Sequence, residues 1–168
     1  MKINLQLISD FNLDLLKRAI ESKKAVEINS VKTSSYGQLY QSIFSFKNDM
    51  NTIIFVWSLP ETHIKSFKDA LNFEDIDKLQ LINEVEEYTN LIINISKKCK
   101  FVFIPTWQRL LYYQTYGIID LKIDNGISKL LNEMNLLLSN KFRDFSNIYL
   151  IDSSEWQLNN IEYINPKL

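Results

Sequence analysis

Four residue types are scarce in this chain of 168 residues, which holds three glycines, three prolines, one cysteine and one histidine. So few glycines and prolines argue against a loop-rich or disordered protein. The single cysteine, Cys99, excludes an internal disulfide and any cysteine-based zinc site. Neighbouring lysines can lower the pKa of a thiol. A lone cysteine is more often buried, however, so we expect Cys99 to be structural.

Neither sign of charge is in excess: 19 lysines and arginines balance 20 aspartates and glutamates, for a formal net charge of −1. No basic stripe interleaved with aromatic residues is present, which argues against a nucleic-acid partner. No run approaches the roughly 20 apolar residues of a membrane span, and no signal-peptide pattern follows Met1. We therefore expect a cytoplasmic protein that binds neither nucleic acid nor membrane.

Apolar residues make up 46% of the chain, enough for a substantial core. Short apolar runs predict five strands, at residues 3–8, 24–29, 52–57, 100–105 and 147–152. Helical spacing between these runs predicts helices over 13–22, 79–96 and 127–142, and a short helix near Gly37. Such alternation is typical of parallel strands joined by right-handed crossovers. The sequence thus predicts one domain over residues 1–168: a three-layer α/β/α sandwich of about five parallel strands, in the flavodoxin-like order 2-1-3-4-5.

Open parallel sheets bind ligands beyond the carboxyl ends of their strands. Polar and aromatic residues follow four of the predicted strand ends, and all three tryptophans of the chain are among them. The candidate substrate- or partner-binding residues are Ser9, Asp10, Asn12, Trp57, Ser58, Thr106, Trp107, Asp152 and Trp156. If catalysis occurs at this edge, Asp10 and Asp152 are its candidate catalytic residues.

Each candidate also has a purely structural interpretation. Ser58 and Glu61 fit a capping box, in which the hydroxyl and the carboxylate satisfy helix N–H groups reciprocally. Asp10 or Asn12 can simply cap the first helix. The tryptophans can be packing residues, and Asp152 can satisfy loop amides. These alternatives remain open at the level of sequence.

The strand layout is similar to that of SGNH hydrolases, in which a serine follows the first strand and an Asp-x-x-His motif follows the last. A serine nucleophile needs a histidine base beside it. Here Phe11 occupies the position expected for the nucleophile, and no histidine follows Asp152. The only histidine, His63, follows the third strand, where we expect an exposed helix residue. No Gly-rich phosphate loop, zinc-protease motif or phosphatase nucleophile motif is present, so we expect no metal or cofactor site in this chain.

An ordered set of segments resembles the N-terminal domain of FkbH-like proteins, multidomain enzymes of the haloacid-dehalogenase (HAD) type. The segments are "SDFNLDLLKRAIE", "YGQLYQSI", "VWSLPETHIKSF", "VFIPTW", "LLNEMNLLL" and "YLIDSSEW". The resemblance implies an SGNH-like fold and an N-terminal position in a larger protein, with a HAD phosphatase-type domain in cis. It also implies an acyl carrier protein as a partner, because well-understood members load a glyceryl unit on such a carrier for polyketide extension. Other members act in capsule or O-antigen biosynthesis.

Three functional hypotheses follow. The leading one is an SGNH-like domain with little activity of its own, which supports substrate or carrier-protein recognition for a HAD partner domain. The second is a small hydrolase or acyltransferase with a rearranged site built on Asp10, Asn12, Ser58 and Asp152. The third is a structural interaction domain whose cleft is filled by tryptophan side chains.

Overall fold

The computed structural model describes residues 2–23, 27–35 and 37–154. The strands are β1 (Ile3–Ser9), β2 (Ile28–Thr33), β3 (Asp49–Trp57), β4 (Cys99–Pro105) and β5 (Ile148–Ile151). The helices are α1 (Asp14–Ser22), α2 (Leu39–Ser45), α3 (Pro60–His63), α4 (Lys65–Leu71), α5 (Lys78–Ser96) and α6 (Ile127–Phe142), with a 3-10 turn, η1, at Gly117–Ile119. Among these residues, no helix is both long and apolar enough to cross a membrane.

The strands form one parallel sheet in the order β2-β1-β3-β4-β5. This confirms the predicted α/β fold and its strand order. The prediction for the second strand was misplaced, because β2 is Ile28–Thr33 and not 24–29; residues 24–26 lie outside the described part. The observed register pairs Val31 with Leu5 of β1, and it buries the Val31 side chain beneath α1.

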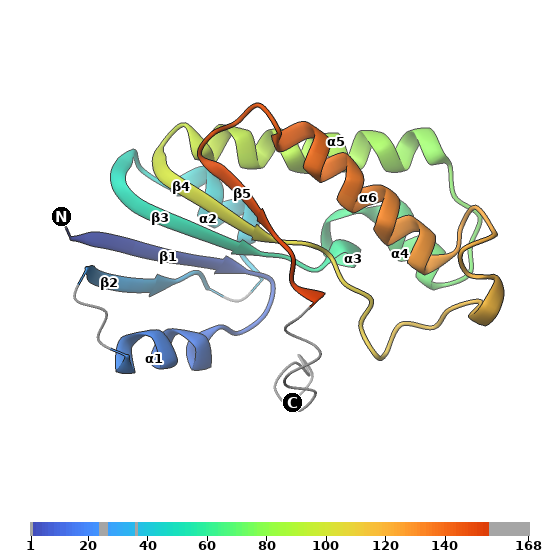
Figure 1. Ribbon diagram of the computed structural model, residues 1–168, viewed down its shortest axis with the longest axis horizontal. Helices are drawn as coiled ribbons and strands as arrows, with labels where there is room; N and C mark the ends of the chain where they lie inside the picture. The colour runs from blue at the N-terminus through green and yellow to red at the C-terminus, as the bar shows by residue number, and fades with distance from the viewer. Residues whose placement is uncertain (1, 24–26, 36, 155–168) are drawn as a thin grey trace.

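The two faces of the sheet are covered unequally. Helices α2, α4, α5 and α6 pack on one face and bury the larger core, which includes Ile54 and Val56 of β3. In Figure 1, α5 and α6 lie together above the sheet and α1 lies below it. The smaller core on the face of α1 has Leu7, Leu13 and Val31 at its centre. Successive residues of a strand point to opposite faces, and the central strands β1 and β3 accordingly contribute side chains to both cores.

Cys99 begins β4 at the end of the sheet opposite the candidate site. Its side chain is buried, and burial raises the pKa of its thiol to about 12. A thiol with so high a pKa is a poor nucleophile at neutral pH. The expectation that Cys99 is structural is therefore consistent with its surroundings.

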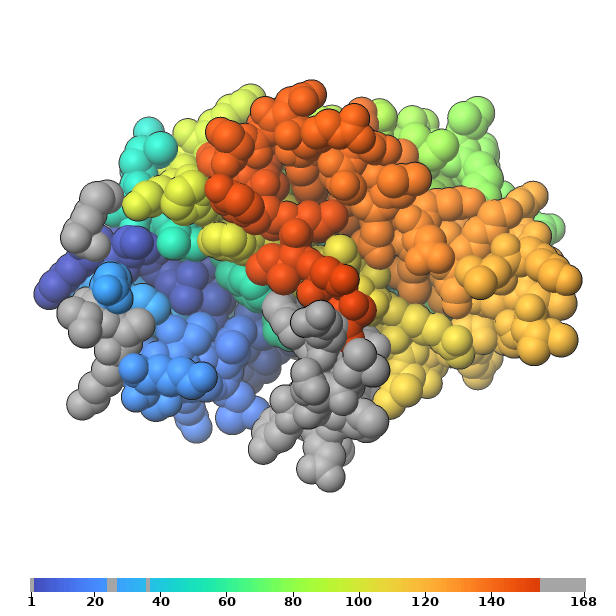
Figure 2. Space-filling model, in the orientation of Figure 1, coloured from blue at the N-terminus to red at the C-terminus, as the bar shows by residue number. Residues whose placement is uncertain are grey.

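A long segment between β4 and α6 is anchored by a buried carboxylate. Asp120 accepts hydrogen bonds from the backbone N–H groups of Tyr116, Ile127 and Ser128, at 3.2, 3.1 and 2.6 Å. Burial alone raises the pKa of a carboxyl, but these hydrogen bonds outweigh it and hold the pKa of Asp120 below its usual value. Gly126 is required here, because a Cβ atom would lie 1.7 Å from the carbonyl oxygen of Asp120. The segment forms the yellow-to-orange end of the molecule in Figure 2.

Candidate functional site

The carboxyl ends of β1 and β3 are joined by a carboxylate. Asp10, directly after β1, accepts a hydrogen bond from the backbone N–H of Leu59 at 2.9 Å and one from the Thr62 hydroxyl at 2.7 Å. Both partners belong to the corner that leads from β3 into the short helix α3. Asp10 therefore holds the loop after the third strand and does not cap α1. The arrowheads of β1 and β3 end beside α3 at the centre of Figure 1.

The same carboxylate binds the only histidine of the chain. His63 Nε2 lies 3.0 Å from Asp10 Oδ1 and 2.9 Å from Oδ2, and the two side chains are 3% and 9% exposed, respectively. The prediction that His63 is an exposed helix residue is therefore wrong. Its imidazole lies between Tyr40 and Tyr88, with ring centroids 5.0 and 5.7 Å away. Its other nitrogen, Nδ1, is buried and has no hydrogen-bond partner among the described residues.

Ser58 belongs to a second buried polar group, next to the first. Its hydroxyl lies 2.7 Å from the hydroxyl of Tyr88 and accepts a hydrogen bond from the indole N–H of Trp107 at 3.3 Å. The backbone of Trp107 is held in turn by the side chain of Asn135, which accepts from its N–H and donates to its carbonyl oxygen. Burial raises the pKa of Tyr88 well above its usual value, so this phenol stays neutral.

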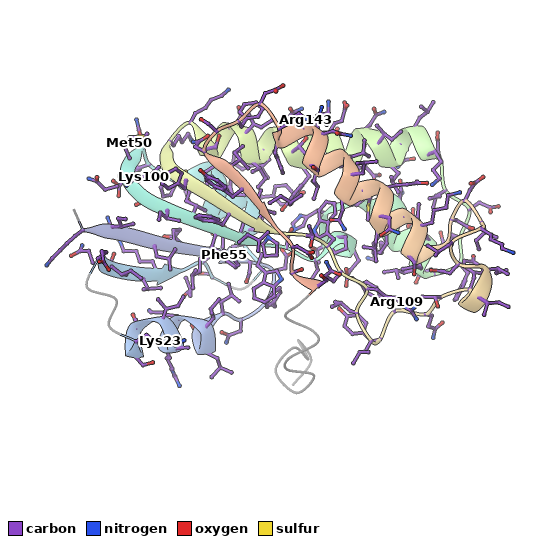
Figure 3. All side chains as sticks on the ribbon, in the orientation of Figure 1. Lys23, Met50, Phe55, Lys100, Arg109 and Arg143 are labelled. Carbon is purple, nitrogen blue, oxygen red and sulfur yellow. The ribbon has the colours of Figure 1, made fainter. Side chains whose placement is uncertain are left out.

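The predicted capping box is absent. Ser58 makes the bonds just described, and no side chain caps the N-terminus of α3. Glu61 reaches away from the helix and accepts hydrogen bonds from the hydroxyls of Tyr112, at 3.1 Å, and Tyr113. Burial and the nearby Glu61 charge raise the pKa of Tyr113. These bonds join α3 to the segment after β4, on which Figure 3 labels Arg109.

The first corner holds Ser9 and Asn12 in local turns. The buried Ser9 hydroxyl donates to the carbonyl oxygen of Phe11, and Asn12 Oδ1 accepts from the N–H of Asp14 at 2.7 Å, at the start of α1. The Phe11 ring packs edge-on against Trp57, with centroids 5.2 Å apart. Trp57 therefore lies on the α1 side of the sheet, with the smaller core, while the next residue in the chain, Ser58, joins the opposite side.

Thr106 bonds Ser153 where β4 and β5 end. Ser153 donates its backbone N–H to Thr106 Oγ1 at 3.2 Å and its hydroxyl to the Thr106 carbonyl at 2.9 Å. Asp152 accepts the N–H of Ser154 at 2.9 Å, and hydrogen bonding by Ser154 lowers the pKa of Asp152. Asp152 is thus an exposed turn residue, and Trp156 lies outside the described residues.

The structure therefore brings together Asp10, Ser58 and Trp107 from the candidate set, linked through residues that the sequence reasoning did not select. His63 joins Asp10, and Tyr88 joins Ser58 and contacts the rings of both His63 and Trp107. Tyr88 lies on the buried face of α5, within the helix predicted over 79–96. A tyrosine hydroxyl on an apolar helix face needs a hydrogen-bond partner when it is buried. That need was the signal in the sequence that could have pointed to Tyr88.

Three serine hydroxyls at this edge are hydrogen-bonded. Ser9 bonds the Phe11 carbonyl, Ser58 bonds Tyr88 and Trp107, and Ser153 bonds Thr106. No described serine makes a hydrogen bond to His63. The described residues also contain no group of three or more His, Cys, Asp or Glu side chains placed to hold a metal ion.

No protein-family model and no curated protein matches the sequence. Its structure resembles a crystallised N-terminal part of the protein BF1531 from Bacteroides fragilis, which contains a phosphatase domain and was complexed with Mg. The TM-score is 0.67 at 12% identity, and the match covers 94% of this chain and 42% of that one. The chain thus spans less than half of the BF1531 chain it matches.

Two lipolytic enzymes have similar structures. One is a member of the G-D-S-L family from Veillonella parvula, with a TM-score of 0.52 at 16% identity over 96% of this chain and 85% of that one. The other is phospholipase A1 from Streptomyces albidoflavus, with a TM-score of 0.52 at 10% identity over 94% and 82%. At such identities the likeness is one of fold, and this chain has an SGNH-like fold.

Proposed function

We propose that this chain is a recognition domain with little hydrolytic activity of its own, belonging to an FkbH-like system with a HAD phosphatase-type domain in cis. It binds a substrate or an acyl carrier protein for glyceryl or acyl transfer, in polyketide or surface-glycan biosynthesis. The catalytic chemistry and any cofactor belong to the partner domain, and this chain needs no cofactor itself.

One observation carries the non-hydrolytic part of this proposal. A serine hydrolase needs a serine hydroxyl within hydrogen-bond reach of a histidine base. Here Phe11 follows Asp10 at the first corner, Ser9 bonds its own turn, and His63 Nε2 is committed to Asp10. The fold is therefore kept without the nucleophile and base pair in the described residues. The likeness to the phosphatase-containing BF1531 chain supports a partner domain of that kind.

Binding to an acyl carrier protein tests the recognition role. We expect the purified chain to bind a carrier bearing its phosphopantetheine arm more tightly than the same carrier without the arm, as measured by isothermal titration calorimetry. Trp107→Phe tests the site, because it removes the indole N–H that reaches Ser58 and keeps most of the packing. Equal affinity for the two carrier forms, or binding to neither, would exclude the carrier role.

A second candidate function is a hydrolase or acyltransferase with a rearranged site. The observation that favours it is the buried Asp10–His63 pair, because an aspartate that orients a histidine supplies two of the three members of a catalytic triad. In this alternative the nucleophile comes from a second substrate. Turnover of acyl thioesters that Asp10→Ala and His63→Ala both abolish, in folded protein, would favour it over the recognition domain.

A further inference from the structure

Asp10 fixes which nitrogen of His63 carries hydrogen. The N–H of Leu59 can only donate, so the Asp10 oxygen that it meets at 2.9 Å, Oδ2, is an acceptor. His63 Nε2 faces both carboxylate oxygens, at 2.9 and 3.0 Å. A donor N–H on Nε2 satisfies that geometry. In a neutral imidazole the other nitrogen, Nδ1, is then a free acceptor.

The free nitrogen has no partner. Nδ1 is buried and makes no hydrogen bond among the described residues. Leaving a buried polar atom unpaired costs free energy, and such atoms are uncommon in folded proteins. An atom that accepts a proton or a hydrogen bond and is held in one orientation is suited to a ligand group that brings its own donor.

One side of the imidazole is closed by a side chain that reaches solvent. Tyr40, in the first turn of α2, packs edge-on against the ring with centroids 5.0 Å apart and is 44% exposed. Tyr88, the other ring in contact with His63, is buried. Rotation of Tyr40 is therefore the movement that we expect to expose the imidazole.

The charge around this position selects against anions. Burial raises the pKa of Tyr40, and the negative charges of Asp10 and Glu87 raise it further. A carboxylate or phosphate group entering past Tyr40 would meet the same two charges. A neutral hydroxyl or thiol would not, and either can donate to Nδ1.

We propose that His63 is an oriented acceptor for a neutral hydroxyl or thiol group of a bound ligand, with Asp10 as its positioning residue and Tyr40 as the side chain that closes the site. The pair differs from the SGNH base, because the histidine comes from the corner after β3 and the aspartate binds Nε2, which leaves Nδ1 to face the ligand. The thiol form of the ligand rests on the proposed carrier role, and the hydroxyl form does not.

Nitrogen NMR on protein labelled with 15N-histidine tests the orientation directly, because His63 is the only histidine. We expect the neutral ring to carry its hydrogen on Nε2 and to leave Nδ1 unprotonated. Folded Asp10→Ala should show a mixture of the two tautomers. The matched control Asp14→Ala, which removes an exposed carboxylate from α1, should leave the wild-type tautomer. A wild-type ring with its hydrogen on Nδ1 would overturn the proposal.

Titration with small probes tests the ligand class. N-acetylcysteamine supplies a thiol and has no hydroxyl, glycerol supplies hydroxyls, and S-methyl-N-acetylcysteamine is the matched compound with neither an S–H nor an O–H donor. We expect the Nδ1 signal to move with the thiol or the hydroxyl probe and not with S-methyl-N-acetylcysteamine, and the apparent affinity to rise at least threefold in Tyr40→Ala. A response to glycerol alone keeps the acceptor site and removes the carrier role. The proposal fails if S-methyl-N-acetylcysteamine moves the signal equally, or if no probe moves it in either wild type or Tyr40→Ala.

Discussion

Replacement of Asp10 by alanine should destabilise the fold strongly, because its carboxylate is 9% exposed and joins β1 to α3. The change leaves the Leu59 N–H and His63 Nε2 without an acceptor, whereas the Thr62 hydroxyl can still donate to the Leu59 carbonyl at 2.7 Å. Each buried donor left unpaired costs about 1–3 kcal/mol. We expect a loss of about 3 kcal/mol and, at about 2–4 °C per kcal/mol for this size, a melting temperature lower by roughly 6–12 °C.

Asp14→Ala is the matched control. Asp14 is an exposed carboxylate in the first turn of α1, where its interaction with the helix N-terminus is worth about 0.3–1 kcal/mol. Urea unfolding followed by circular dichroism gives the free energy of unfolding of both variants, provided that the m-value stays constant. If Asp10→Ala unfolds within 1 kcal/mol of Asp14→Ala, the carboxylate does not hold the corner as argued.

A double-mutant cycle separates the pair from the rest of the corner. In a His63→Ala background, Asp10→Ala loses only its bonds to Leu59 and Thr62, so its cost should fall by about 0.5–3 kcal/mol, the range measured for residues in contact. Additive losses would mean that the bond between Asp10 and His63 contributes nothing to stability.

Three further predictions concern activity, packing and pH. The chain should hydrolyse aryl esters no faster than a Ser9→Ala/Ser58→Ala double variant, measured spectrophotometrically; since a general base supplies about 10²–10⁴-fold, faster turnover would be plain. Gly126→Ala should lower the free energy of unfolding by more than about 2 kcal/mol, whereas Gly37→Ala, with open space but a φ of +68°, should lose only about 1 kcal/mol. Because the folded-state pKa of Asp120 is lowered, its stabilisation is complete above the unfolded value of about 3.9 and is lost as pH falls through the folded value. Asp120→Asn should therefore have a lower free energy of unfolding than wild type at neutral pH. Between pH of about 4 and 2, its free energy of unfolding should fall less than that of wild type, which acid denaturation measures.

The fold was predictable because its signals are long and periodic. Apolar runs and helical stripes located four of the strands and both long helices, and the parallel order followed from their alternation. Boundaries depended on register. The second strand was predicted too early in the chain because Ala25 and Val26 are apolar. In the structure the strand that pairs with β1 contains Val31 instead, opposite Leu5. Leu79 begins the helix predicted over 79–96 and is apolar, yet it is 71% exposed in the first turn of α5.

The position of the site, at the carboxyl edge of the sheet, could be predicted from the sequence. The contacts between its residues could not. Parallel topology brings strand ends to one edge, so Asp10 and Ser58 were expected to be close. Which face each residue takes depends on where the strand stops alternating. Trp57 is the last residue of β3 and points to the α1 side, while Ser58 points to the side of α5. Spacing alone does not separate two such neighbours, and Trp57 packs with the smaller core whereas Trp107 packs with the larger one.

His63 shows most clearly what spacing omits. A histidine at the end of a four-residue helix after a Pro-Glu pair looks like a solvent-facing residue. It is buried because Asp10, 53 positions earlier in the chain, supplies a hydrogen-bond acceptor that offsets the cost of burying the imidazole. The corner that holds a nucleophile in SGNH hydrolases thus holds Phe11 here, and the carboxylate beside it is bonded to the chain's single imidazole. The hydroxyls of Ser9, Ser58 and Ser153 are hydrogen-bonded and His63 Nε2 is bonded to Asp10, and the proposed binding of a donor group rests on these contacts.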